Sequence, residues 1–271
     1  MTARVALATA TARLAAVSPT PRLDAELLMA HALGISRNTL LLSRLDDPTP
    51  ATFAPLIDRR LAHEPVAYIT GTRDFWTITL AVGPGVLIPR PDSETLIEAA
   101  VTHFAGTPGP RSILDLGTGS GALLLAALDQ WPDAAGVGID ASECALTIAQ
   151  SNASRLGMET RARIVAGGWQ GDGGTHDLIL CNPPYIGNAE DLPREVAEWE
   201  PPSALFAGAD GLADYRAIAA VLRRQLAPGG VACLEIGSTQ ADSVSALFAA
   251  AGFAVAVRPD LAGHARCLIL T

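Results

Sequence analysis

Apolar residues in the first quarter of the chain recur at the three- and four-residue spacing that is typical of amphipathic helices. Leu23, Leu27 and Leu28 form one such group, and two further groups of leucines and isoleucines follow. Glycine and proline residues lie between these groups, as expected where helices end. The pattern therefore predicts a small all-helical domain over residues 1–74.

The pattern then changes to alternation of apolar and polar residues over 75–82, which predicts a β-strand. Gly83-Pro84-Gly85 is a turn signal, and Val86-Leu87-Ile88 can pair back as a second strand. We therefore expect a connecting β-hairpin over residues 75–90.

From residue 91 onward, apolar runs of strand length alternate with stretches of helical periodicity, the first of which Asp92 is placed to cap. This alternation predicts an α/β domain over residues 91–271, with a doubly wound, mostly parallel sheet of seven strands. A short loop joins the last two strands, which suits an antiparallel closing pair. The expected strands are 112–116, 136–140, 163–166, 177–181, 231–236, 254–258 and 267–270.

The composition is that of a packed protein, because 49% of the 271 residues are hydrophobic and only 17% are charged. The net charge is −9, and all 19 cationic residues are arginines. A surface that binds nucleic acid needs clustered cations, so we expect no direct contact with nucleic acid.

The cysteines and histidines predict no metal site and no disulfide framework. The four cysteines include no C-x-x-C pair, and no two of the five histidines lie four residues apart. Arg13 interrupts the apolar N-terminal stretch, so we expect no signal peptide, and no apolar run approaches the length of a membrane span. We expect a monomer in the reducing cytoplasm.

A glycine-rich loop, Gly117-Thr118-Gly119-Ser120-Gly121, follows Asp115 at the end of the first expected strand of the α/β domain. Its glycines allow the backbone to approach a ligand at the start of the next helix, where free N–H groups favour a carboxylate. Asp140 ends the next strand, where a carboxylate can accept hydrogen bonds from ribose hydroxyls. The candidate ligands are a dinucleotide and S-adenosylmethionine, and the alternative is a glycine turn that binds no ligand.

We favour S-adenosylmethionine, because Asp115 would repel a pyrophosphate but can help to hold an ammonium group or orient the loop. Trp169, just after the third strand, is placed either to pack against the adenine or to serve as an ordinary core aromatic residue.

Asn182-Pro183-Pro184-Tyr185 follows another apolar strand. Asn182 offers a side-chain carbonyl and Pro183 a backbone carbonyl without a competing N–H, so two acceptors can receive an NH2 group. Tyr185 adds a flat face for an amide or a base. Two prolines after a strand also form a plain turn, but with the upstream loop the tetrapeptide indicates methyl transfer to a planar nitrogen.

With these motifs, the chain resembles the class I methyltransferases, and specifically the HemK family, which methylates the glutamine side-chain amide of peptide chain release factors. The resemblance covers nearly the whole chain. It is carried by Gly71-Thr72-Arg73-Asp74-Phe75-Trp76, Leu87-Ile88-Pro89-Arg90-Pro91-Asp92-Ser93-Glu94, the segments 115–121 and 182–185, Glu200-Pro201 with Ala204-Leu205, and Asp260-Leu261-Ala262-Gly263 with Arg266.

The resemblance implies a class I methyltransferase sheet that binds S-adenosylmethionine through the loop at 117–121, Asp140, Trp169 and Asn182. It implies that the segment 182–185 binds the substrate amide, with Asn182, Pro183 and Tyr185 acting in catalysis. The expected substrate is the glutamine of the Gly-Gly-Gln motif. Apart from the resemblance, we expect the helical domain to recognise the protein substrate, and the alternative is that it only stabilises the fold as a cap. The chain departs from the family pattern at Gly168, where members usually carry an acidic residue that can bond to the adenine amino group.

Two other functions stay open at this point. The first is an amino-methyltransferase that acts on adenine or guanine of DNA or RNA with the same tetrapeptide. It predicts a basic channel, whereas five acidic residues follow the tetrapeptide between positions 190 and 200. The second is a catalytically silent protein that only binds the cofactor, which predicts a damaged motif, whereas Asn182 and Asp140 are intact.

Overall fold

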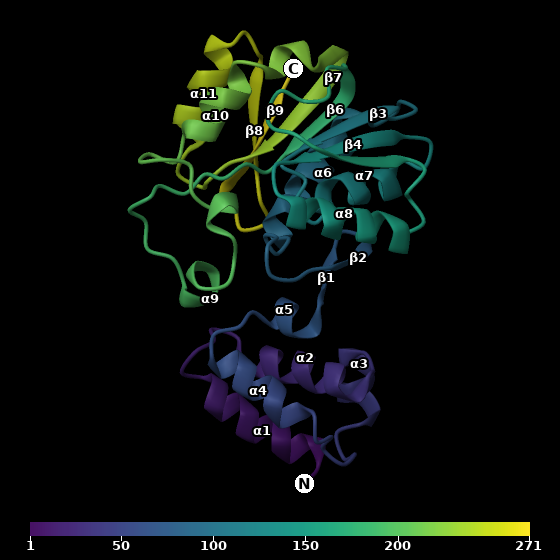
Figure 1. The fold of residues 1–271 in the computed structure, drawn as a ribbon, viewed down its shortest axis with the longest axis vertical. Coiled ribbons are helices and arrows are strands. Elements are labelled where there is room, and N and C mark those ends of the chain that lie inside the picture. The colour runs from purple at the N-terminus through teal and green to yellow at the C-terminus, as the bar shows by residue number, and fades with distance from the viewer. The chain divides into compact units, whose positions relative to one another are not determined.

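The computed structural model describes all residues from 1 to 271, and they form two compact units (Figure 1). The first unit contains residues 1–72 and also residues 192–199. The second contains residues 73–191 and 200–271. The chain therefore leaves the second unit shortly after the N-P-P-Y tetrapeptide and returns to it at Glu200.

The first unit is helical, with its apolar core formed by the inward faces of its helices. Pro21 opens α2 in the first turn, where its missing N–H costs nothing, and Gly34 ends that helix in the left-handed conformation. The helices are α1 (Ala3–Leu14), α2 (Pro21–Leu33), α3 (Arg37–Ser43), α4 (Phe53–Leu61), α5 (Val66–Thr70) and α9 (Arg194–Ala197).

A buried cation links the segment 192–199 to the rest of the helical unit. The Arg60 side chain is 3% exposed, and its guanidinium lies 2.7 Å from the Asp24 carboxylate and 2.7 Å from the Glu195 carboxylate. The sequence pattern did not predict that this distant segment joins the helical unit.

The hairpin was predicted with the wrong strands. The observed two-stranded sheet pairs β1 (Thr72–Phe75) with β2 (Ile78–Ala81), and the turn lies at Trp76, which has a positive φ of 54°. Residues 86–88 form no strand, and the Ile88 N–H donates to the Glu200 carboxylate at 3.0 Å.

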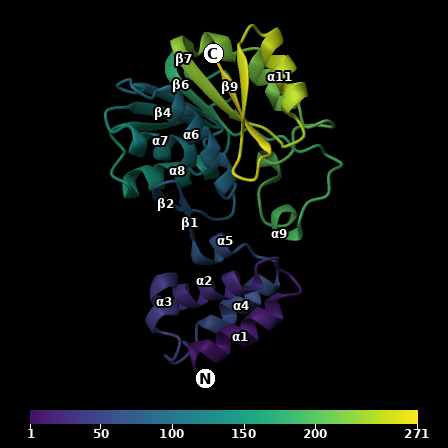
Figure 2. The same ribbon diagram turned by 180° about the vertical axis from the view of Figure 1, so that it is seen from behind.

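The second unit is built on a seven-stranded sheet with the order β5-β4-β3-β6-β7-β9-β8, seen from its two sides in Figures 1 and 2. The first five of these strands are parallel, and β9 is antiparallel to both of its neighbours. The strands are β3 (Ser112–Leu116), β4 (Ala135–Asp140), β5 (Ala162–Ala166), β6 (His176–Cys181), β7 (Leu226–Glu235), β8 (Val255–Pro259) and β9 (Ala265–Leu270).

Helices cover both faces of this sheet, so its central strands are apolar on both sides. Leu178 and Leu180 of β6 contribute to one core, whereas Ile179 and Cys181 contribute to the other. The first core packs against α6 (Glu94–His103), α7 (Ala122–Gln130) and α8 (Glu143–Arg155), and the second against α10 (Ala213–Ala219) and α11 (Ala241–Ala250). This arrangement confirms the predicted α/β fold class. None of the helices combines the length and the apolar character that a bilayer crossing requires.

Candidate active site

The site lies where the strand order reverses. The chain runs outward from β3 through β4 to β5, and then returns to place β6 on the other side of β3. In a doubly wound sheet, the loops at the carboxyl ends of such strands separate and leave a crevice that binds ligands. Asp140 ends β4, and the glycine loop and Asn182 follow β3 and β6 at that edge.

The glycine loop has a backbone that a side chain would disturb. Gly117, Gly119 and Gly121 all have positive φ, and a β-carbon on Gly117 would lie 3.4 Å from the Trp169 ring. A β-carbon on Gly119 would meet no protein atom within 4 Å, so this part of the loop borders open space. The loop therefore offers backbone to a ligand.

Asp115 holds the loop from inside. Its Oδ2 accepts hydrogen bonds from the Thr118 hydroxyl at 2.6 Å and from the Leu124 N–H at 3.2 Å. Complete burial raises the pKa of Asp115 to about 7, although both hydrogen bonds lower it. Oδ2 thus orients the loop, while Oδ1 is buried and accepts no hydrogen bond from the protein.

Asp140 connects the loop to the next helix. Its two carboxylate oxygens accept hydrogen bonds from the Gly119 N–H and the Ser142 N–H, each at 2.9 Å. The Ser142 side chain in turn caps α8 by accepting from the Ala145 N–H. A carboxylate has about four lone-pair directions, so Asp140 retains acceptors for a ligand.

Asn182 and Pro183 present unpaired acceptors. The Asn182 Nδ2 donates to the Ser93 hydroxyl at 3.2 Å, while its Oδ1 accepts no hydrogen bond from the protein. The Pro183 carbonyl likewise accepts no backbone hydrogen bond. Gly211 permits this loop path, because a β-carbon there would lie 2.3 Å from the Tyr185 carbonyl oxygen.

A cavity of about 320 Å³ opens among these loops. The residues from the sequence-based set that line it are Gly117, Gly119, Asp140, Trp169, Asn182 and Pro184. A hollow of about 50 Å³ beside it is lined by Thr118 and Ser120 and shares Gly117, Gly119 and Asn182. The residues of the set that line neither space are Asp115, Gly121, Pro183 and Tyr185.

Tyr185 turns its hydroxyl toward a buried carboxylate. It donates to Glu235 Oε1 at 3.3 Å, and burial raises the pKa of the phenol above its ordinary value. The tyrosine therefore stays protonated near neutral pH.

The segment around Ile88-Pro89-Arg90, one of those that carry the family resemblance, is fixed to the Glu200-Pro201 segment. Glu200 is buried, accepts from the Ile88 N–H and pairs with the Arg90 guanidinium at 2.5 Å. Leu87 and Pro201 line the cavity on either side of this pair. The ion pair thus holds one wall of the cavity together.

Two family models match the chain, one over most of the helical unit and one over the first part of the α/β unit. Residues 5–71 match the model of the PrmC N-terminal domain, and residues 93–198 match that of the methyltransferase small domain.

Whole-chain relatives carry one common name. The release factor glutamine methyltransferase of Rhodospirillum rubrum is 45% identical over 256 residues, which cover 92% of this chain and 78% of that protein. The release factor glutamine methyltransferase of Mycolicibacterium smegmatis is 41% identical over 277 residues, which cover 99% of this chain and 97% of that protein. The chain belongs to the release factor glutamine methyltransferase family. The resemblance to HemK proteins is thereby confirmed.

Solved structures support the fold of this release factor glutamine methyltransferase family member. A methyltransferase from Pyrococcus furiosus superposes with a TM-score of 0.56 at 20% identity, covering 79% of this chain and 95% of that one. The ribosomal protein L11 methylase of Lactobacillus delbrueckii gives a TM-score of 0.50 at 19% identity, covering 70% and 83%. At these identities the likeness concerns the sheet and its helices only.

Three polar residues at the site of this family member had no role predicted from the sequence, although one of them, Ser93, lies in the segment 87–94 that carries the resemblance. Asp214 lines the cavity and accepts from the Trp169 indole N–H at 3.0 Å. Ser93 and Glu235 contact Asn182 and Tyr185 respectively. Only Glu235 carried a usable signal, because an acidic residue inside an otherwise apolar strand must have partners when it is buried. No group of three or more metal-binding side chains is present.

Proposed function

We propose that the protein transfers a methyl group from S-adenosylmethionine to the side-chain amide nitrogen of a glutamine, the one in the Gly-Gly-Gln motif of peptide chain release factors. The observation that carries this proposal is the unpaired acceptor Asn182 Oδ1 on a residue that lines a ligand-sized cavity, followed in the chain by the unpaired Pro183 carbonyl. Two acceptors fit the two N–H groups of one carboxamide.

The residues around the cavity fit the cofactor. Its volume of about 320 Å³ is in the range of small-molecule sites. Asp140 has acceptors left for ribose hydroxyls, and Trp169 offers a flat ring at the cavity wall. The first turn of α7, at Ala122 and Leu123, lines the smaller hollow, where N–H groups favour a carboxylate. At Gly168 the chain has no side chain for the adenine amino group.

When bound, the cofactor supplies a methyl group on a sulfonium, which is a good leaving group. The protein must supply the geometry, because the lone pair of a carboxamide nitrogen is delocalised into its carbonyl. If Asn182 and Pro183 accept hydrogen bonds from the two N–H groups of the carboxamide, the lone pair of its nitrogen is turned toward the methyl carbon. Both acceptors then also stabilise the positive charge that develops on nitrogen, more strongly in the transition state than before it. The surplus proton leaves to water, so no general base is required.

The partner in this proposal is a protein. We assign substrate recognition to the helical unit, residues 1–72 and 192–199, and methyl transfer to the unit formed by residues 73–191 and 200–271. We further propose that the enzyme works as a cytoplasmic monomer without direct contact to nucleic acid, in keeping with its net charge of −9.

Methylation of a purified release factor tests the substrate. We expect intact-mass analysis to show one added methyl group on the native factor and none on a variant with Gln→Glu in the Gly-Gly-Gln motif. The variant lacks the two donors and adds a buried charge beside unpaired acceptors. Bulk RNA and DNA, incubated with the enzyme and labelled S-adenosylmethionine, serve as alternative substrates. Methyl transfer to both factors, or to nucleic acid alone, would overturn the assignment.

Asp140→Ala is expected to weaken cofactor binding by about 1.5 to 3 kcal/mol, since hydrogen bonds to a charged acceptor are lost. The loss also frees the Gly119 N–H that this carboxylate holds. Calorimetric titration with S-adenosylmethionine measures the change, and circular dichroism checks the fold. Glu143→Ala is the matched control, because Glu143 is exposed three residues away and lines no part of the cavity. Equal affinities of the two variants would remove Asp140 from the site.

A further inference from the structure

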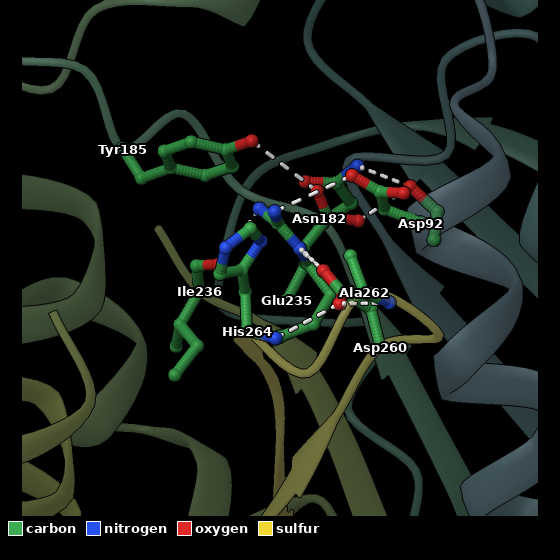
Figure 3. A network of polar contacts seen from close by, with 10 residues as sticks. Asp92, Asn182, Tyr185, Glu235, Ile236, Asp260, Ala262 and His264 are labelled. Atoms are coloured by element: carbon green, nitrogen blue, oxygen red, sulfur yellow. Dashed lines mark hydrogen bonds and ion pairs between the residues drawn. The ribbon is translucent and has the colours of Figure 1, made fainter. Parts of the chain in front are cut away.

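Glu235 is a buried carboxylate that the methyl transfer described above does not use. It is 1% exposed, at the end of β7. Oε1 accepts from the Tyr185 hydroxyl at 3.3 Å, and Oε2 accepts a short hydrogen bond from the Ser93 hydroxyl. Figure 3 shows the Tyr185 hydroxyl directed toward this carboxylate, in a network that also contains Asn182. Glu235 is therefore connected to Ser93 by one hydrogen bond and to Asn182 by two hydrogen bonds in series.

Ser93 can serve Asn182 in only one way. A serine hydroxyl has a single proton, and here that proton is donated to Glu235. The Ser93 oxygen can then only accept from Asn182, so it selects the Nδ2 end of the carboxamide.

We propose that Glu235, acting through Ser93, fixes the Asn182 carboxamide with Nδ2 turned away from the cavity and Oδ1 turned toward the substrate. Glu235 and Ser93 are thus positioning residues that do not touch the reacting atoms. The inference rests on the proposed function, because the orientation matters only if the substrate presents N–H donors. In the reversed orientation, the Asn182 NH2 would face the substrate NH2, and two donors cannot bond to each other.

The segment Asp260 to Gly263 with Arg266, near the carboxyl end of the chain, supplies a positive charge that supports this arrangement. Arg266 lies 3.3 Å from both the Asp92 and the Asp260 carboxylates and donates to the Ile236 carbonyl. Asp260 also accepts from the N–H groups of the turn between β8 and β9, as Figure 3 shows. The turn therefore holds Arg266 in place, and its positive charge lowers the pKa of Glu235 against the effect of burial.

Protonation of Glu235 would release the orientation. A protonated carboxyl can donate to Ser93, and the serine proton is then free to be donated to Oδ1 of a reversed Asn182. Burial raises the pKa of Glu235 to about 7. Activity should therefore be present above this value and fall as the pH decreases through it.

Six other titratable or charged groups face Glu235. They are Tyr185, Tyr215, Cys181, Cys267, Arg266 and Asp92. Burial raises the pKa of both tyrosines and both cysteines, so these four remain neutral near pH 7, and the raised pKa of Arg266 keeps it cationic. Asp115, in the glycine loop, has a pKa of about 7 as well. The part of the activity loss at low pH that is due to Glu235 is therefore measured as the difference between the wild type and a variant of Glu235.

Glu235→Gln is the decisive variant, with kcat measured on the full chain from pH 5.5 to 8.5. A glutamine can either accept from Ser93 or donate to it, so the orientation of Asn182 is no longer imposed. We expect kcat to fall about tenfold at pH 8, with an unchanged KM for S-adenosylmethionine. The acid limb of the pH profile, which is the fall of kcat as the pH decreases, should lose the part that is due to Glu235. A variant that keeps the full limb would contradict the inference.

Ser93→Ala tests the link itself. It should give a similar loss of kcat, and the double variant with Glu235→Gln should be no worse than Ser93→Ala, because both changes break one chain of contacts. Tyr215→Phe is the control, since Tyr215 donates to the backbone carbonyl of Glu235 at 2.8 Å and leaves the carboxylate alone. It should keep the acid limb.

A substrate-free measurement separates this inference from the proposed function. The side-chain amide signals of Asn182, identified by their absence in Asn182→Asp, should shift with a midpoint near pH 7 in the wild type and not in Glu235→Gln or Ser93→Ala. A titration without methylation of release factor would reject the function and keep the positioning role. Methylation without any titration of these signals in the wild type would reject the positioning role, even if both variants failed to fold.

Discussion

Asn182→Ala is expected to lower turnover by about a hundredfold or more, the usual cost of deleting one positioned hydrogen-bond partner of a transition state. The variant loses the side-chain acceptor and leaves the Pro183 carbonyl as the only one facing the substrate amide. Ser93 also loses its partner, but it keeps its hydrogen bond to Glu235, so the fold should survive.

Single-turnover methylation measures this loss apart from binding. We expect a smaller change in the affinity for S-adenosylmethionine, because the loop at 117–121 and Asp140 keep their contacts. Asn188→Ala is the matched control, since Asn188 is an exposed asparagine six residues further on. A single-turnover rate near that of the control would show that the acceptor pair has been misassigned.

Arg60→Met is expected to destabilise the helical unit by about 3 to 5 kcal/mol, the range found when one partner of a buried ion pair is removed. The substitution keeps the volume but leaves Asp24, which is 5% exposed, without its cation. It also detaches Glu195, so the segment 192–199 loses an ion pair to α4.

Hydrogen exchange at the amides of α2 and α4 in the full chain reports this change without assuming that both units unfold together. Arg4→Met is the control, because the pair of Arg4 with Asp46 is exposed and is worth at most about 1 kcal/mol. Equal protection in the two variants would mean that the buried pair adds no more than a surface one. Adding Asp24→Leu to Arg60→Met should recover much of the loss, since no buried charge is then left unpaired.

The strands of the central sheet could be predicted to within a few residues at most ends, because strands buried on both faces read as continuous apolar runs. The exception is β7, which begins at Leu226, five residues before the expected start, since it includes Pro228 and two glycines that read as a turn. The hairpin failed for a related reason. Its turn uses Trp76 in a left-handed conformation that the sequence does not announce, whereas Gly83-Pro84-Gly85 is a strong turn signal without a second strand after it.

The candidate site was predictable where function depends on residues close together in the sequence. The glycine loop, Asp140 and the N-P-P-Y tetrapeptide each follow a strand, and parallel strands bring their carboxyl ends to one edge. Ser93, Asp214 and Glu235 could not be placed, because their partners lie 45 to 142 residues away in the chain. Such contacts depend on the tertiary packing of several elements, which no local pattern encodes.

The helical unit is formed by two separate stretches of the chain, so it cannot be completed early in synthesis on the ribosome. Residues 192–199 complete this unit, but residues 73–191 must be translated first. At about 5 to 20 residues per second, this interval lasts roughly 6 to 24 seconds. During that time the nascent helices have Arg60 paired with Asp24 but not yet with Glu195. The helical unit therefore reaches its final set of contacts only after the N-P-P-Y segment has been translated, while residues 200–271 of the second unit are still to be made.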